Sequence, residues 1–212
     1  MSFRQLAAVI KTALARKPEW EKRINAVDKS FDATHGVNTG GIIGLSRLTV
    51  VQGSKATGMR HVAVEPNIFE AAMSRLDIDH SRFSFIDLGS GKGRALYLAR
   101  RYPFARVMGV EFARELHEAA RTNVGHDPRV TLHCGDAGAF EFPPGPLVVY
   151  LYNPFDATIM QAVADRLMDS YLTDQRDIFV MYLNPFQAQA WGRFEKVVSA
   201  DLLEVYRASA KG

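Results

Sequence analysis

The sequence predicts an α/β fold with a doubly wound, mainly parallel sheet, and three observations carry this prediction. The first is a short apolar run, residues 83–88, that leads into the turn Gly89-Ser90-Gly91-Lys92-Gly93 and then into a helical pattern. The second is the alternation of strand-like and helix-like segments over the rest of the chain. The third is length, because 212 residues can bury a full core. Strands that alternate with helices in this way indicate parallel pairing.

The N-terminal part is expected to be helical to about residue 29, with Pro18 in the first turn of a second helical piece. Residues 1–18 carry four basic and no acidic side chains, with apolar residues at helical spacing. We interpret them as a helix packed on the main domain, and a targeting or membrane-surface segment is the alternative. Residues 31–58 are rich in glycine and lack periodicity, so they predict a loop with one short helix around residues 42–48. This loop either closes over a ligand or is a plain linker.

The later elements follow from apolar spacing and turn residues. Residues 66–76 carry an apolar stripe at helical spacing and are expected to form a helix. After the first strand, strands are expected at residues 106–112, 129–136, 147–155 and 177–184, with helices at residues 114–123 and 157–172 between them. Residues 194–201 and 202–209 fit a closing antiparallel pair.

The glycine-rich turn predicts a ligand-binding site. Glycine turns the chain without Cβ strain and lets the backbone lie against a ligand, and a helix start offers free N–H groups to a polar or anionic group. A dinucleotide fingerprint has its third glycine three residues after the second, where this chain has Arg94, so a nicotinamide-dependent oxidoreductase is disfavoured. Lys92 and Arg94 are expected on the solvated face of the helix start. No phosphate-binding loop of the nucleotide hydrolases is present.

Acidic residues follow three of the expected strands. Asp87 lies two residues before the first glycine, Glu111 lies about 20 residues further on, and Asp136 ends the third strand. A carboxylate at the position of Glu111 can accept hydrogen bonds from ribose hydroxyls. We expect Glu111 and Asp136 to converge on one ligand beside the glycine turn.

The pattern Asp-x-Gly-x-Gly-x-Gly at residues 87–93 resembles the first motif of the class I S-adenosylmethionine-dependent methyltransferases. Three later segments resemble further motifs of that family in the same order: RVMGVEF with Glu111, RVTLHCGD with Asp136, and LVVYLYNPF at residues 147–155. The resemblance covers residues 83–155. It implies a seven-strand sheet with helices on both faces, a reversed C-terminal β-hairpin, an N-terminal helical cap and S-adenosylmethionine as cofactor.

The resemblance also implies a role for individual residues. The glycines would approach the cofactor through their backbone, Asp87 and Ser90 would contact its methionine part or orient the turn, and Phe112 would cover an adenine face. Asp136 and the Ala137 backbone would meet the adenine edge. The residues that would bind the cofactor are therefore Asp87, Gly89, Ser90, Gly91, Gly93, Glu111, Phe112, Asp136, Ala137 and Asn153.

At the methyl-transfer end, Asn153 would orient a nucleophilic nitrogen or oxygen through its carbonyl, and Phe155 would pack against the methyl site. Asn-Pro-Phe differs from the Asn/Asp-Pro-Pro-Tyr/Phe pattern of enzymes that methylate adenine or glutamine nitrogen, which weakens both substrate classes. A protein lysine or a small molecule is the expected acceptor, and a non-catalytic binder of the same nucleoside is the alternative.

Other residues leave alternatives open. A second Asn-Pro-Phe at residues 184–186 either lines the same pocket or only ends its strand. His35 and His61 are candidate bases, with a solvated or structural role as the favoured interpretation. Tyr150 and Tyr152 alternate with apolar neighbours and are interpreted as core residues.

Composition sets the remaining limits. An apolar content of 47%, a charged content of 23% and a net charge of +3 are ordinary for a globular protein, and because the charges are dispersed no nucleic-acid partner is expected. No apolar run approaches the roughly 20 residues that cross a bilayer. The single cysteine, Cys134, excludes an internal disulfide and fits a cytoplasmic location, and no metal site is expected. We predict a cap with a glycine-rich lid loop at residues 1–60 and a cofactor-binding domain at residues 61–212.

Overall fold

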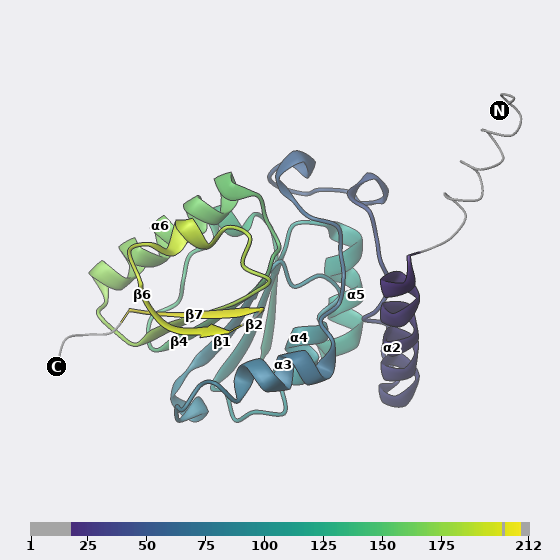
Figure 1. Ribbon diagram of the computed structural model, residues 1–212, viewed down its shortest axis with the longest axis horizontal. Helices are drawn as coiled ribbons and strands as arrows, with labels where there is room; N and C mark the ends of the chain where they lie inside the picture. The colour runs from purple at the N-terminus through teal and green to yellow at the C-terminus, as the bar shows by residue number, and fades with distance from the viewer. Residues whose placement is uncertain (1–17, 201, 209–212) are drawn as a thin grey trace, which may run out of the picture.

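The computed structural model describes residues 18–200 and 202–208, and its centre is one seven-stranded sheet (Figure 1). The strand order is β3-β2-β1-β4-β5-β7-β6. The first five strands pair in parallel, whereas β7 is antiparallel to both β5 and β6. The predicted fold class, with its reversed C-terminal hairpin, is confirmed. The strands are β1 (Ser84–Leu88), β2 (Arg106–Glu111), β3 (Val130–Cys134), β4 (Leu147–Tyr152), β5 (Ile178–Leu183), β6 (Glu195–Ala200) and β7 (Leu203–Ala208).

Helices cover both faces of the sheet. One face carries α3 (Pro66–Met73), α4 (Arg94–Ala99) and α5 (Arg114–Val124), and the other carries α6 (Ala157–Thr173) (Figure 1). Successive strand residues point to opposite faces, so the core is divided into two apolar clusters by the sheet. All five residues of β1 are buried, as expected for a parallel strand with a helix layer on each side.

The N-terminal helical cap is α2 (Glu19–His35). Pro18 precedes its first turn, and Gly36 ends it with a φ of 65°, a left-handed conformation that glycine adopts without strain. The chain then runs without regular structure to α3, apart from two short 3-10 turns at Leu45–Arg47 and Lys55–Thr57. The helix predicted around residues 42–48 is therefore a single 3-10 turn. The basic segment of residues 1–17 lies outside the described residues.

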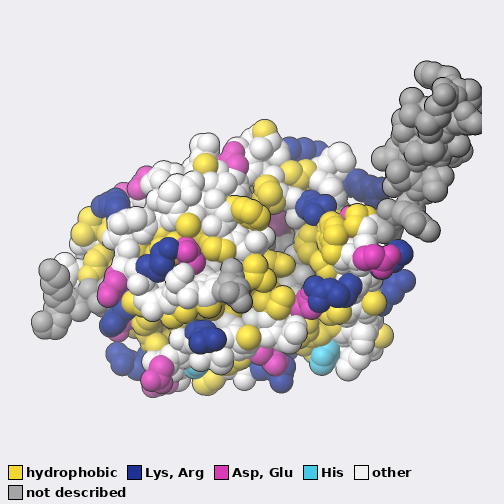
Figure 2. Space-filling view, viewed as in Figure 1, with side chains coloured by type: hydrophobic (Ala, Val, Ile, Leu, Met, Phe, Trp, Pro, Cys, Tyr) yellow, Lys and Arg dark blue, Asp and Glu magenta, His cyan; other side chains and the backbone are white. Residues whose placement is uncertain are grey.

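The surface carries both signs of charge. Figure 2 shows Lys and Arg side chains interspersed with Asp and Glu side chains over one face of the molecule. No helix in the described part of the chain is long and apolar enough to cross a bilayer. Within the same residues, no three His, Cys, Asp or Glu side chains are grouped so that they can hold a metal ion. The cytoplasmic location stays a prediction.

Candidate active site

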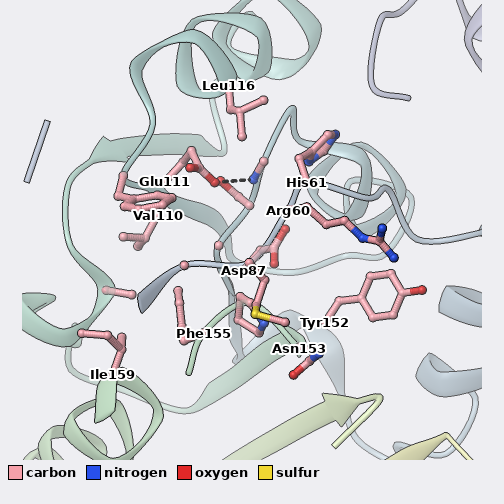
Figure 3. A pocket seen from close by; sticks show the side chains of 18 of the residues that line it. Arg60, His61, Asp87, Val110, Glu111, Leu116, Tyr152, Asn153, Phe155 and Ile159 are labelled. Atoms are coloured by element: carbon pink, nitrogen blue, oxygen red, sulfur yellow. Dashed lines mark hydrogen bonds between the residues drawn. The ribbon is translucent and has the colours of Figure 1, made fainter. Parts of the chain in front are cut away.

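A pocket lies at the carboxyl ends of β1, β2 and β4 (Figure 3). It contains about 880 Å³ of space free of protein atoms, including its open mouth. Apart from Gly93, every residue predicted to bind the cofactor or to act in catalysis lines this pocket. The topology explains its position: the strand order reverses between β1 and β4, and ligands of open α/β sheets bind in the crevice at such a point.

The glycine turn has no room for a side chain at Gly89 or Gly91. Gly89 and Gly91 have φ values of 80° and 54°, in the left-handed region. A Cβ on Gly89 would lie 2.4 Å from the Cβ of Pro154, and one on Gly91 would lie 2.4 Å from Nδ1 of His61. The two glycines therefore let the exit of β4 and the chain around His61 pack directly against the turn.

The turn is also fixed to its neighbours by its backbone. The N–H groups of Gly89 and Ser90 both donate to the carbonyl of Val110 in β2, at 2.9 and 3.0 Å. Gly93 has a φ of 84° and faces Ala120 of α5, whose Cβ would be 3.3 Å from a Cβ at this position. Gly93 thus starts α4 and allows α5 to pack closely, and it lies outside the pocket lining.

Glu111 ends β2 with its carboxylate turned toward the glycine turn (Figure 3). Oε2 accepts a hydrogen bond from the N–H of Gly91 at 2.8 Å, and Oε1 accepts one from the N–H of Ala113 at 2.9 Å. Burial raises the pKa of Glu111 to about 7, although these bonds act in the opposite direction. Asp87 is 4% exposed, and the pKa of its carboxyl is raised well above the usual value by burial first and then by the charge of Glu111.

Asp136 lies on the side of β3. Its Oδ1 accepts the N–H of Gly138 at 2.8 Å, which caps the short turn Ala137–Ala139. Its Oδ2 faces Gly53, where a Cβ would be 3.2 Å away. Glu111 and Asp136 line the same pocket from neighbouring strand ends, as the sequence predicts.

The exit of β4 supplies Asn153 and Phe155. Asn153 has a φ of 44°, in the left-handed region where asparagine is enriched among residues other than glycine. The second Asn-Pro-Phe repeats this turn, with a φ of 54° at Asn184, yet Phe186 is 69% exposed. None of the residues 184–186 lines the pocket, so the hypothesis that both exits share it is wrong, and the second one only ends its strand.

Residues 51–64, here called the roof segment, cover the pocket. The N–H of Val51 donates to the carbonyl of Phe112 at 3.0 Å, and the N–H of Met59 donates to the carbonyl of Pro154 at 3.2 Å. The N–H of Asp156 donates to the carbonyl of Thr57 at 2.9 Å. The roof segment is thus bonded to the chain after both β2 and β4. The closing role of the loop at residues 31–58 stays a prediction.

His61 of the roof segment lines the pocket, and its role as a base or as a structural residue stays a prediction. Its Nε2 lies 3.3 Å from the carbonyl oxygen of Thr39, and burial lowers its pKa to about 4, so the ring is neutral at physiological pH. His35 instead packs against Phe31 and Tyr97, with ring centres 4.4 and 5.4 Å away. The sequence does not show which of these two histidines lies at the pocket. The path of the roof segment decides this, because it brings His61 to the pocket lining.

The prediction that Arg94 lies on a solvated face is wrong, because its side chain is 2% exposed. Nη2 lies 3.1 Å from Asp28 and 3.3 Å from Asp32, both on α2, and Nε donates to the hydroxyl of Thr39. The guanidinium also lies 4.0 Å from the ring centre of Phe31. These contacts attach α2 and the chain after it to the start of α4.

Lys92 reinforces this attachment and is half-buried. Its Nζ donates to Oδ1 of Asn38 at 2.9 Å and to the carbonyl of Gly40 at 2.7 Å. The N–H of Gly40 donates to Asp32, and that of Gly41 donates to Asp28. The segment 38–41 is therefore held between the carboxylates of α2 and the cations that follow the glycine turn.

Comparisons with known proteins agree with this geometry. Residues 85–171 match the protein family described as a methyltransferase domain. The 23S rRNA methyltransferase ErmE has 12% identity, with 71% of this chain and 70% of that chain covered and a TM-score of 0.52. A predicted N6-adenine-specific DNA methylase from Listeria monocytogenes has 11% identity, with 70% and 52% covered and a TM-score of 0.53. The pyocyanin biosynthetic protein PhzM has 17% identity, with 68% and 56% covered and a TM-score of 0.53.

No curated protein sequence matches the chain. The three solved structures share its fold, and the matched family contains the glycine turn and the strands that line the pocket. Residues 85–171 therefore match a methyltransferase domain, and the chain shares the fold of these three structures.

Proposed function

We propose that S-adenosylmethionine lies across the glycine turn, with its adenosine at Glu111 and Asp136 and its methionine end at Asp87. The observation that carries the proposal is that side chains from the ends of neighbouring strands line one pocket. Carboxylate oxygens suit the ribose hydroxyls and the adenine amino group as acceptors. The order β3, β2, β1, β4 then corresponds to adenine, ribose, methionine end and methyl acceptor along the ligand.

Methyl transfer requires alignment more than acid–base chemistry. A lone pair of the acceptor forms a bond to the methyl carbon while the carbon–sulfur bond breaks, and the electron pair of that bond stays on sulfur. The protein has to hold the two groups in line and exclude water. We propose that Asn153 orients the acceptor through its carbonyl oxygen and that Phe155 and the roof segment exclude water. His61, with a pKa of about 4, is a weak base and is proposed only as a neutral hydrogen-bonding group.

We propose a small molecule or a protein lysine side chain as the acceptor. The roof segment favours an acceptor, or part of one, that is narrow enough to reach Asn153 beneath it. The expectation against nucleic acid is not supported, because the same fold occurs in an rRNA methyltransferase and a DNA methylase. Oligonucleotides therefore belong in the panel of acceptors. A non-catalytic scaffold is the remaining alternative.

Calorimetric titration of the full chain with S-adenosylhomocysteine tests whether the pocket binds the cofactor. We expect saturable 1:1 binding, and substitution of Glu111 or Asp136 by alanine should weaken it by about tenfold or more, as expected for a lost hydrogen bond to a charged group. NAD serves as the control ligand and should not bind. Binding of NAD without binding of S-adenosylhomocysteine would overturn the assignment.

Asn153→Ala tests the catalytic role, and the repeated Asn-Pro-Phe provides its matched control. Once an acceptor has been found by release of S-adenosylhomocysteine from a panel of metabolites, peptides and oligonucleotides, Asn153→Ala should lower kcat by about 10- to 100-fold because the acceptor is no longer aligned. Asn184→Ala alters the same turn outside the pocket and should leave kcat unchanged. Equal turnover by both variants would remove the role of Asn153.

A further inference from the structure

The hydroxyl of Tyr150 is a buried polar group without a partner. Tyr150 is 1% exposed, and among the described residues its hydroxyl has no hydrogen bond. An unpaired buried hydroxyl costs free energy, so native proteins rarely keep one without a reason. The phenol ring packs at 5.4 Å from the ring centre of Phe69 and at 5.7 Å from that of Phe85, which accounts for the ring but not for the hydroxyl.

Tyr150 lines the pocket beside Asp87. The two residues are register partners on the neighbouring strands β4 and β1, and their side chains lie on the same face of the sheet. Asp87 is buried and lies at the centre of the close-up in Figure 3. Val64 and Ala95 complete this part of the lining with apolar surface. This recess thus holds the hydroxyl of Tyr150, unpaired among the described residues, next to the carboxyl of Asp87.

The strand order shows which part of the cofactor would reach this recess. Glu111 and Asp136, proposed for the adenosine, follow β2 and β3, whereas Asp87 and Tyr150 lie on β1 and β4, on the other side of the glycine turn. A ligand that lies across the turn, with its adenosine beside Glu111 and Asp136, therefore has its other end beside Asp87 and Tyr150. Its amino-acid end carries an ammonium and a carboxylate, and a phenol can accept from the first or donate to the second.

We propose that the hydroxyl of Tyr150 binds the amino-acid end of S-adenosylmethionine next to Asp87, an inference that rests on the ligand placement proposed above. The hydroxyl remains protonated, because burial and the nearby Asp87 carboxyl raise its pKa well above the usual value. The described residues give the hydroxyl no partner, and in this proposal the ligand provides one.

Tyr150→Phe tests this assignment with two ligands. S-Adenosylhomocysteine has the amino-acid end, and 5′-methylthioadenosine lacks it. We expect the Kd of S-adenosylhomocysteine to rise about tenfold, because one hydrogen bond to a charged group is lost. The Kd of 5′-methylthioadenosine should stay within about twofold of its original value. The unfolding temperature of the free variant should not fall, because no hydrogen bond of the free protein is removed.

Tyr182→Phe is the matched control. Tyr182 is buried in β5 outside the pocket, and its hydroxyl accepts the N–H of Gln187 at 3.1 Å. This variant should unfold at a lower temperature and bind both ligands as before. Unchanged binding of S-adenosylhomocysteine by Tyr150→Phe, or an equal loss for both ligands, would overturn the role of Tyr150. Failure of the unaltered protein to bind S-adenosylhomocysteine would instead overturn the proposed function.

Discussion

The Glu111 carboxylate has a structural role, and we propose that it also binds the ligand. Without ligand it fixes the glycine turn through the N–H of Gly91, and in the proposed complex its oxygens also accept the ribose hydroxyls. Its pKa of about 7 lies above the ordinary value of 4.5 because the group is buried. Between these two values the folded protein holds a proton that the unfolded chain has lost. The contribution of Glu111 to stability is therefore full below about pH 4.5 and is lost as the pH rises through about 7.

Ligand binding should have the opposite pH dependence, because ribose hydroxyls donate to the ionised carboxylate. We expect the Kd of S-adenosylhomocysteine to rise by up to about tenfold for each pH unit below about pH 7 and to level off above it. Calorimetric titrations between about pH 6 and 8 measure this effect. Glu111→Gln has no proton to lose, so the step near pH 7 should disappear in this variant. A Kd that is flat over this range in the unaltered protein would contradict the proposed role.

At the scale of elements, one buried cation connects α2 to α4. Arg94 is surrounded by two carboxylates, the hydroxyl of Thr39 and an aromatic ring, so its charge is compensated where water is excluded. Removing one partner of a buried ion pair leaves the other charge uncompensated, which costs far more than the pair itself contributes. The attachment of the cap thus depends on both sides of this contact being present.

Arg94→Met should lower the free energy of unfolding by about 3–5 kcal/mol, because Asp28 is left as a buried charge. Adding Asp28→Asn should restore part of the loss, since the second charge is then removed as well. Arg121→Ala is the control: its pair with Glu118 is exposed, and its loss should cost less than about 1 kcal/mol. Urea unfolding of the four proteins provides the measurement. Equal stability of Arg94→Met and Arg121→Ala would contradict the account.

For the molecule as a whole, the division into residues 1–60 and 61–212 stays a proposal about sequence organisation. Several contacts cross it: Arg94 binds Asp28, His61 lies against Thr39, and Met59 bonds to Pro154. Each of them either supports the glycine turn or closes the pocket. The two parts are therefore expected to behave as one cooperative unit.

A chain that begins at residue 61 tests this expectation. It lacks α2 and most of the roof segment, so Arg94 is left without its carboxylates and the pocket without its cover. We expect no cooperative urea transition and at least about a hundredfold weaker binding of S-adenosylhomocysteine than in the full chain, since a buried charge is left unpaired and several pocket contacts are lost. Unfolding curves and calorimetry would reveal the opposite result, a fragment that unfolds in two states and binds normally.

Much of the fold and of the site follows from local signals. The strands and helices have clear apolar periods, and the glycines and acids follow strand ends, where a parallel sheet brings its ligands together. This is why Glu111, Asp136 and Asn153 could be named before any coordinates. Their roles in binding and transfer stay predictions.

The rest depends on contacts between distant residues. In the sequence, Arg94 follows a glycine turn and has no feature that distinguishes it from an exposed residue at the start of a helix. It is buried because it contacts carboxylates more than 60 residues earlier in the chain. Apart from one 3-10 turn, the roof segment has no regular structure, and several of its backbone hydrogen bonds go to distant segments, such as those to Phe112 and Pro154. The two Asn-Pro-Phe turns are identical in sequence, and only their neighbours make Phe155 buried and Phe186 exposed.

The pocket lining begins at Gly53 and ends at Ile159, so it draws on the middle half of the chain. On the ribosome the cover is made first and the strand ends beneath it are made last. A nascent chain therefore has no complete pocket until the start of α6 has emerged. Until then, the carboxylates proposed to bind the ligand are exposed to water.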